Sequence, residues 1–268
     1  MTLKYYNTGG VNSLIEEFFH LTFDESDLPF ESKVLPICSP TITYIYNNQH
    51  RFLYKKKQTL CNQLILTGQF YDSYQFLVEE KGHSYGISLK PTTLYKLTKL
   101  DVSKIKNKHV QLSKFSKDLH DILNPIFLKY EDEIPKLSQN LKKVISKVPV
   151  ETNSEIDTID QAIEIIHSRE GMLNAYELLD YIGYSQKTLE THFKKIVGIT
   201  PGKYIRLFRF LRLMRKYESN TIKLKDLIYM YNYYDHSHFS KDFRHFMKES
   251  PKNYFKSEHP FLNKYLNK

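Results

Sequence analysis

The chain of 268 residues carries a formal net charge of +9, and 41% of its residues are hydrophobic. This length suits two domains with separate cores, and a 26% share of charged residues argues against a chain that is disordered throughout. The two cysteines exclude a disulfide framework and make a poor zinc site, so we expect no metal, no cofactor and a reducing cytoplasm. The first ten residues lack a signal-peptide core, and the absence of any run of about 18 apolar residues predicts no membrane partner.

The region from about residue 33 to residue 112 consists of short apolar runs with high strand propensity, separated by polar breaks; the clearest runs are 41–46, 63–66, 75–78 and 85–89. This pattern predicts a small β-barrel or sandwich. Residues 11–23 are predicted to form one helix before it, because Leu14, Ile15, Phe18 and Phe19 share a helical face.

The period becomes helical from residue 113 to about residue 148, with a break predicted at Asn124-Pro125. The apolar stripe of these helices has two interpretations, which are packing onto the chain's own β domain and a dimerisation surface. Residues 149–157 are polar and are predicted to form a linker.

Positive charge is concentrated near the C-terminal end of the chain. Residues 187–256 contain 16 Lys or Arg against 6 Asp or Glu, a net charge of +10 that exceeds that of the whole chain. Such a local excess suits a polyanionic partner, whereas evenly spread lysine would only keep a surface soluble. Without a membrane anchor, we expect this partner to be nucleic acid.

Two stretches in this basic region repeat one pattern at an offset of about 50 residues. Residues 185–194 correspond to 235–244, and Phe193, Pro201 and Tyr204 correspond to Phe243, Pro251 and Tyr254. A period of this length suits a whole supersecondary unit, and each copy has the parts of a helix-turn-helix.

The first copy is predicted to contain a helix over 175–182, a turn at Gly183 in the left-handed conformation, and a second helix capped by Ser185. Leu189 and Phe193 are expected to bury against the first helix.

The second copy begins with a helix over 225–231, and Asn232 takes the place of the glycine because Asn also tolerates the left-handed conformation. Asp235 is the predicted cap, and Phe239 and Phe243 repeat the buried pair. In both copies a Thr-Pro or Ser-Pro pair then starts a further helix with a capping hydroxyl.

A basic helix over 201–217 joins the two copies, and its arginines follow one slowly drifting stripe: Arg206, Arg209, Arg212 and Arg215. A rigid helix fixes the distance between the two units. One turn of DNA is about 34 Å long, so a single chain could reach two successive major grooves.

The region from about residue 156 to residue 257 resembles the DNA-binding domain of the AraC/XylS family of transcription regulators. The residues that carry the resemblance are 177–179 with 183–185, 193–195 with 197–201, and 233–240 with 243–244 and 250–254. Asn232 and Ile228 depart from the family pattern, which has a second glycine and a small residue there. The resemblance implies a cytoplasmic regulator that is not an enzyme, with double-stranded DNA as partner and RNA polymerase as a second partner if it activates.

The resemblance also implies that the helix after each turn enters the major groove. The candidates for reading bases are then Gln186, Lys187, Glu190 and Thr191 in the first copy, and His236, Ser237, Ser240 and Lys241 in the second. The candidates for contacting phosphates are Lys194, Lys195, Arg206, Arg244 and Lys248. For each of these residues the alternative is a solvated helix face. Structural roles in turns and caps fall to Gly183, Ser185, Asn232, Asp235, Pro201 and Pro251.

These patterns predict an α+β fold with four parts. Residues 1–112 form a small cupin-like β-barrel or sandwich domain with flanking helices, residues 113–150 a helical connector, residues 151–258 an all-α domain of two helix-turn-helix motifs joined by a long helix, and residues 259–268 a tail. In the AraC/XylS family the β domain often senses a small molecule, and residues 82–97 resemble the N-terminal domain of a little-characterised subgroup.

The sequence leaves three alternatives to a ligand-controlled regulator. A ligand-independent DNA-binding protein would lack an effector site altogether. A cupin-like metal enzyme needs converging histidines and a carboxylate, whereas the histidines of the N-terminal part are scattered: His20, His50, His83, His109 and His120. A DNA-repair enzyme with an appended domain of this family needs a cluster of reactive cysteines, which Cys38 and Cys61 do not supply.

Overall fold

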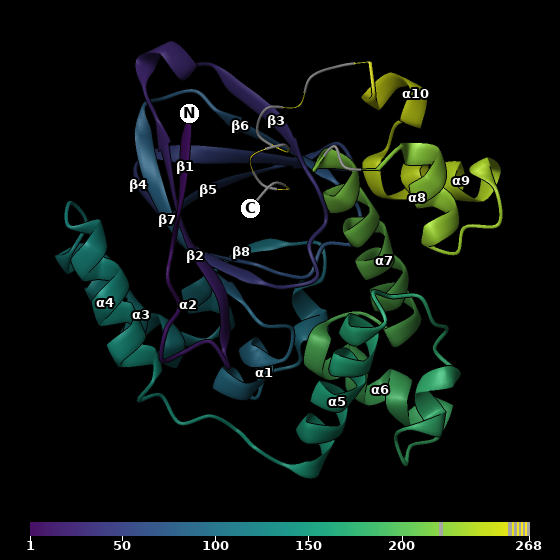
Figure 1. The fold of residues 1–268 in the computed structure, drawn as a ribbon. Helices are drawn as coiled ribbons and strands as arrows, with labels where there is room; N and C mark the ends of the chain where they lie inside the picture. The colour runs from purple at the N-terminus through teal and green to yellow at the C-terminus, as the bar shows by residue number, and fades with distance from the viewer. Residues whose placement is uncertain (220–221, 257–258, 260–261, 263, 265, 267–268) are drawn as a thin grey trace.

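The computed structural model describes residues 1–219, 222–256, 259, 262, 264 and 266. A β domain formed by the N-terminal part packs against a helical C-terminal domain, and two further helices cover the opposite flank of the β domain (Figure 1). The predicted α+β architecture is confirmed.

Within the described residues, eight antiparallel strands form the sheet: β1 (Thr2–Tyr6), β2 (Ile15–Phe23), β3 (Phe30–Val34), β4 (Thr41–Tyr54), β5 (Lys57–Thr67), β6 (Tyr74–Val78), β7 (Gly82–Leu89) and β8 (His109–Gln111). The main path runs β1-β2-β7-β4-β5-β8, and β6 pairs with β3 and β4. The first half of β4 pairs with β7, and the second half pairs with β6 from His50 onward. Because one long strand serves two partners in turn, the sheet divides and curls around an interior.

The prediction of a helix over residues 11–23 was wrong, since most of this segment forms β2, which pairs with β1 and β7. The reason is an irregularity in the β2–β7 register between Ile15 and Glu17. A bulge of this kind inserts one residue into the alternation of a strand. Ile15 and Phe18 are therefore both buried although they lie three positions apart, a spacing that imitates one face of a helix.

The middle of the chain forms α1 (Thr93–Thr98), η2 (Val102–Ile105), α2 (Leu112–Phe115), α3 (Lys117–Lys129) and α4 (Ile134–Ile145). The break predicted at Asn124-Pro125 was wrong, because α3 continues through Pro125. Helix α3 packs on the β domain: the Phe127 carbonyl accepts a 3.0 Å hydrogen bond from Tyr46, and its ring lies 5.4 Å from that of Tyr44. The apolar stripe of the connector is thus used for packing within the chain.

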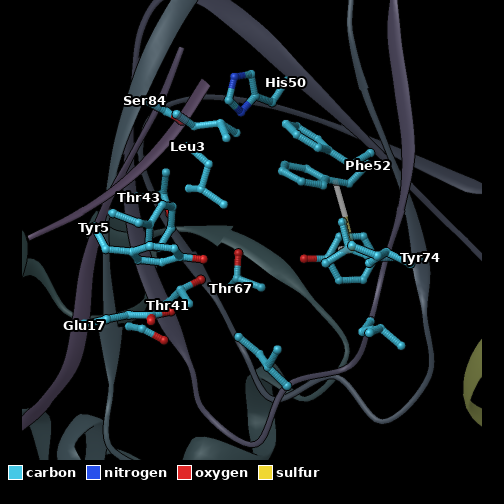
Figure 2. Close-up of a pocket in the computed structure, with 18 residues that line it drawn as sticks. Leu3, Tyr5, Glu17, Thr41, Thr43, His50, Phe52, Thr67, Tyr74 and Ser84 are labelled. Carbon is cyan, nitrogen blue, oxygen red and sulfur yellow. The ribbon is translucent and has the colours of Figure 1, made fainter. Parts of the chain in front are cut away.

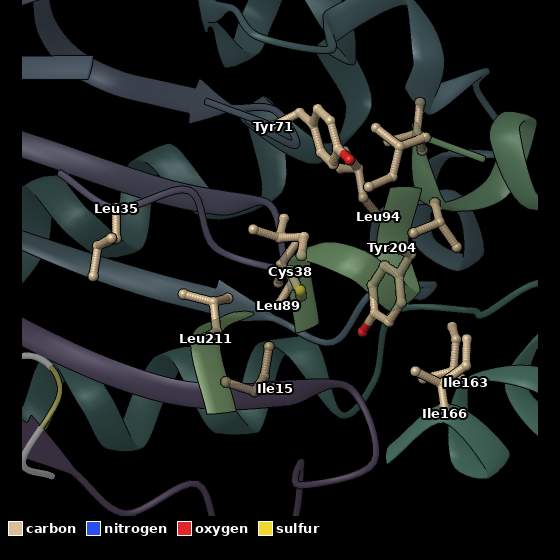
Figure 3. Close-up of a cluster of buried hydrophobic side chains, with 14 of the residues drawn as sticks. Ile15, Leu35, Cys38, Tyr71, Leu89, Leu94, Ile163, Ile166, Tyr204 and Leu211 are labelled. Carbon is tan, nitrogen blue, oxygen red and sulfur yellow. The ribbon is translucent and has the colours of Figure 1, made fainter. Parts of the chain in front are cut away.

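The C-terminal domain contains α5 (Ser154–Ser168), η3 (Glu177–Asp180), α6 (Gln186–Val197), α7 (Pro201–Glu218), α8 (Leu224–Met230), α9 (His236–Met247) and α10 (Pro251–Tyr254). One cluster of buried apolar side chains runs from the β domain into this domain, as the positions of Ile15, Cys38, Leu211 and Tyr204 show (Figure 3). Of the predicted tail 259–268, the structure describes His259, Leu262, Lys264 and Leu266, and the rest lies outside the described residues.

Candidate DNA-binding interface

The first helix-turn-helix unit consists of η3, a turn and α6. The helix predicted over 175–182 is shorter than expected, a single 3-10 turn at Glu177–Asp180. Gly183 lies in the turn but, contrary to expectation, does not have a positive φ. Ser185 is the predicted cap, and its Oγ accepts a 3.2 Å hydrogen bond from the Thr188 amide. Leu189 and Phe193 are buried as predicted.

The second unit consists of α8, a turn and α9. Asn232 has a φ of 54°, so it adopts the left-handed conformation that its residue type predicts. Asp235 caps α9 by accepting a 2.7 Å hydrogen bond from the His238 amide. Phe239 and Phe243 are buried against α8 and α7, which confirms the repeated apolar pair.

The Pro residues that follow each unit begin a helix in both copies, as predicted. Ser250 caps α10 through a 3.2 Å hydrogen bond from the Asn253 amide. Thr200 makes no side-chain cap on α7, so the capping hydroxyl predicted there was wrong; Pro201 alone marks this start.

Helix α7 is joined to the second unit by a buried carboxylate that the sequence analysis did not single out. Asp242, on α9, is only 1% exposed. It accepts a 2.6 Å hydrogen bond from Nε of Arg206 and a 3.2 Å hydrogen bond from the Tyr233 hydroxyl. The Arg209 guanidinium lies 3.8 Å from the same carboxylate and 4.8 Å from the Tyr233 ring centroid. Two arginines of the predicted stripe therefore fix α9 to α7.

A second carboxylate, Glu170, joins the loop after α5 to α7 and to the second unit. It accepts a 2.9 Å hydrogen bond from the Tyr231 hydroxyl and forms a 2.5 Å ion pair with Arg212. Burial would raise the pKa of this carboxyl, but the hydrogen bonds from Arg212 and Tyr231 outweigh it and hold the pKa below its ordinary value. Helix α7 is thus held at two positions along its length by internal ion pairs.

The candidates for reading bases lie on the N-terminal halves of α6 and α9. Gln186, Lys187 and Thr191 are exposed on α6, and His236, Ser237 and Lys241 are exposed on α9. Glu190 and Ser240 are half-buried, and Glu190 accepts a 2.9 Å hydrogen bond from Gln186. Each unit therefore presents a polar, accessible face at the start of its second helix.

The candidates for contacting phosphate have different surroundings. Lys194 and Arg244 are exposed, and Nζ of Lys195 lies 5.3 Å from the ring centroid of Tyr95 in α1. Arg206 is committed to Asp242, although 40% of its side chain remains exposed. Lys248 forms a 3.1 Å ion pair with Asp72 of the β domain.

The β domain contacts the C-terminal end of α9 around Asp72, which lies between β5 and β6. Besides Lys248, this buried carboxylate has Nζ of Lys55 at 3.4 Å and Nε2 of His245 at 3.4 Å, and it accepts a 2.9 Å hydrogen bond from Tyr54. Burial would raise the pKa of Asp72, but the hydrogen bonds from Tyr54 and Lys248 lower it further than burial raises it.

One backbone hydrogen bond and one ion pair also join the β domain to the C-terminal end of α9 and the residue that follows Lys248. The amide of Ser73 donates a 2.7 Å hydrogen bond to the Phe246 carbonyl, and Lys33 of β3 pairs with Glu249. No sequence pattern pointed to these contacts, because they join residues more than 170 positions apart.

The β domain also contacts the first unit. Helix α6 packs on η2 and α1, and Gly198, which ends α6 with a φ of 100°, lies against Gln69 and Val102. Asp160 of α5 accepts hydrogen bonds of 2.6 Å from Thr92 and 2.5 Å from Lys96. The β domain therefore holds both units of the C-terminal domain.

The β domain contains a partly open cavity of about 130 Å³ that is lined mainly by apolar side chains. Figure 2 shows His50 at one end and the hydroxyl groups of Tyr5, Thr67 and Tyr74 directed into the interior. One lining residue, Leu262, comes from the chain beyond the second unit. Within the described part of the chain, no three His, Cys, Asp or Glu residues are grouped so that they could hold a metal ion.

Taken together, the two capped units on a shared helix and the basic charge around them define a DNA-binding helix-turn-helix protein. Residues 178–257 match a family described as a helix-turn-helix domain, and residues 9–111 match a domain of unknown function, DUF6597. The helix-turn-helix match supports the resemblance of the C-terminal domain to the AraC/XylS family, and the chain is a DNA-binding transcription regulator.

Several solved structures resemble this chain. ToxT from Vibrio cholerae O395, bound to (E)-4-(8-methylnaphthalen-1-yl)but-3-enoic acid, is 15% identical; the match covers 96% of this chain and 99% of ToxT with a TM-score of 0.48. The AraC-like transcriptional activator CuxR is 14% identical, with 78% and 79% of the two chains covered and a TM-score of 0.33. No curated protein matches the sequence. Among the described residues, none of the helices has the length and apolar character needed to cross a bilayer.

Proposed function

We propose that this regulator reads two successive major grooves of one DNA duplex, with α6 in one groove and α9 in the next, and that the β domain modulates the binding. The observation that carries the proposal is the attachment of both units to a single rigid helix. The 18 residues of α7 correspond to a length of about 27 Å, which is close to the length of about 34 Å for one turn of DNA.

On the two exposed faces, some residues then read bases and others contact phosphates, as the sequence predicts. Lys187 and Lys241 donate to guanine acceptors, while Lys194 and Arg244 contact phosphates and set the register. The domain boundaries at residues 112, 150 and 258, the dimerisation of the chain and its contact with RNA polymerase stay predictions.

Hydroxyl-radical footprinting of the full chain on DNA selected from a random pool tests the reading of two grooves. We expect two protected patches on one face of the duplex, with centres about 10 base pairs apart. A single patch, or two patches on opposite faces, would contradict the proposal.

Modulation by the β domain is supported by its contacts with both units and by its cavity. The alternative is a DNA-binding protein that needs no ligand. A small molecule present at 100 times its dissociation constant stabilises its target by about 2.7 kcal/mol, which a thermal-shift screen detects. A hit that also changes DNA affinity supports modulation, and a hit that leaves DNA affinity unchanged favours the alternative.

A further inference from the structure

The cavity in the β domain is of a size that restricts what can enter. Its volume is about 130 Å³, and an apolar cavity of about 150 Å³ in a protein admits benzene. The walls are largely aromatic and aliphatic, with Phe19, Phe52 and Phe76 among them. The interior therefore suits a molecule with a single ring or of equivalent bulk.

The charge of the lining side chains disfavours anionic ligands. Among the described residues that line the cavity there is no Lys or Arg, and Glu17 is the single charged side chain. A carboxylate ligand would lose its hydration without forming an ion pair in the cavity. The free-energy cost of this desolvation is far larger than the gain from apolar contact. An anionic ligand is therefore disfavoured.

His50 supplies a polar group at one end of the cavity. Its ring is 2% exposed and lies 5.0 Å from the ring of Phe76 and 5.9 Å from that of Phe23. A ring nitrogen is directed into the cavity (Figure 2). The ring atom Nε2, which has almost no accessible surface, has no hydrogen-bond partner among the described residues. Burial lowers the pKa of His50 to about 3, so the imidazole is neutral at physiological pH and has one N–H donor and one acceptor nitrogen.

We propose that the cavity binds an uncharged, hydroxyl-bearing molecule about the size of one aromatic ring, with its hydroxyl hydrogen-bonded to His50. A hydroxyl both donates and accepts, so it matches either tautomer of the ring. This inference rests on the proposed modulation by the β domain, because it names the class of effector.

The position of the cavity connects it to the DNA-binding domain. Glu17, Ile37 and Ser88 line both this cavity and a neighbouring one, whose other lining residues include Arg212 and Arg215 of α7. Leu262 of the C-terminal segment also lines the first cavity. A bound molecule thus lies one layer of side chains from the helix that separates the two recognition helices.

Isothermal titration calorimetry of the full chain with small probes tests the inference. We expect phenol to bind about tenfold more tightly than benzene, because benzene leaves the buried imidazole unpaired. Benzyl alcohol and benzoate are close in size and differ in charge, and we expect benzyl alcohol alone to bind at pH 7. Benzoate or benzylamine binding as tightly as benzyl alcohol, or no binding by any probe, would overturn the inference.

The variant His50→Met removes the polar atoms with little change in volume. We expect benzene to bind as before and the tenfold preference for phenol to disappear, whereas His120→Met, outside the cavity, keeps it. A preference that survives in His50→Met would overturn the role of His50, and the wild-type comparison of benzyl alcohol with benzoate decides the question of charge even if the variant fails to fold. Footprinting of the protein on DNA without any probe tests the proposed DNA binding independently, so failure of the ligand inference can be distinguished from failure of the proposed function.

Discussion

At the scale of single residues, Asp242 supports the proposed DNA-binding interface although its side chain is buried. Its carboxylate lies on α9, the proposed recognition helix of the second unit, and its partners lie on α7 and in the turn before α9. A buried charge is tolerated only when it is paired and hydrogen-bonded. The pairing therefore fixes the orientation of α9 relative to α7, and with it the direction in which the exposed face of α9 points.

Replacing Asp242 by Asn should lower the free energy of unfolding by about 1.5–3 kcal/mol, since the hydrogen bonds from Arg206 lose their charged acceptor. Urea denaturation at pH 7 measures this loss. Asp226→Asn, at an exposed position of α8, is the control and should change stability by less than about 0.5 kcal/mol. Equal, small effects for both variants would mean that the Asp242 cluster does not fix α9.

Lys241 is exposed on α9 and is the residue on which specificity in the second groove is most easily tested. We expect Lys241→Ala to weaken binding to the selected site by about 1–3 kcal/mol and to leave binding to random DNA nearly unchanged. Competition titrations with specific and random duplexes measure both. An equal loss on every sequence would reassign Lys241 to a phosphate contact.

Local residue chemistry was sufficient to predict the caps at Ser185, Asp235 and Ser250, because a cap depends on only three or four neighbouring positions. Asp242 was missed, although it lies three positions after Phe239 and four before Phe246, on the apolar face of its helix. A charged residue on such a face is a signal that a buried partner exists. Its partner Arg206 is 36 positions away, and no local pattern names it.

At the scale of elements, the stability of the second unit depends on the packing of α9. Phe243 is fully buried, and its ring contacts Phe210 of α7, Phe239 of α9 and Tyr254 of α10. We expect Phe243→Ala to cost about 3–5 kcal/mol by leaving a cavity among three helices. Thermal unfolding and footprinting should then show loss of the second protected patch, and a stable variant with both patches intact would contradict the buried pair.

The periodicity of apolar residues predicted most elements of the fold. It failed where a strand has the apolar spacing of a helix. The strands at 41–46, 63–66, 75–78 and 85–89 were recognised because their apolar runs are short and bounded by polar breaks. Residues 11–23 were not, because the bulge between Ile15 and Glu17 gives β2 the spacing of a helix. The first helix of the first unit was predicted too long, since the apolar pattern of 175–182 does not distinguish one 3-10 turn from two α-helical turns.

At the scale of the whole molecule, several histidines are buried in the neutral state. Burial lowers the pKa of His50 and His109 to about 3, and burial lowers the pKa of His20 and His167 to about 4. The unfolded chain takes up protons at these residues below about pH 6.5, whereas the folded chain does not. Their contribution to stability is therefore complete above pH 6.5 and is lost as the pH falls toward the folded pKa values.

We expect the free energy of unfolding to be lower at pH 5.5 than at pH 7.5, by up to about 1.4 kcal/mol for each buried histidine. Urea denaturation at both pH values measures the difference. His109→Gln should reduce it, while His236→Gln, at an exposed position, should not. An unchanged difference in His109→Gln would show that the buried histidines are not its source.

The arrangement of the two domains depends on contacts that no local pattern reveals, and the one at Asp72 bears directly on function. Its carboxylate holds Lys248, a predicted phosphate contact, together with Lys55 and His245. While this ion pair is formed, DNA phosphates must compete with Asp72 for the same ammonium group. Asp72→Asn removes the competing charge but retains an oxygen that accepts the hydrogen bond from Tyr54.

We therefore expect Asp72→Asn to bind DNA about three- to tenfold more tightly at low salt, and to steepen the dependence of log affinity on log salt by about one unit, the value for one added phosphate contact. Fluorescence anisotropy with a labelled duplex at several salt concentrations measures both quantities. Asp132→Asn, at an exposed position, removes the same charge away from α9 and should leave the slope unchanged. If both variants gain affinity equally, the effect is one of net charge, and the β domain does not restrain Lys248.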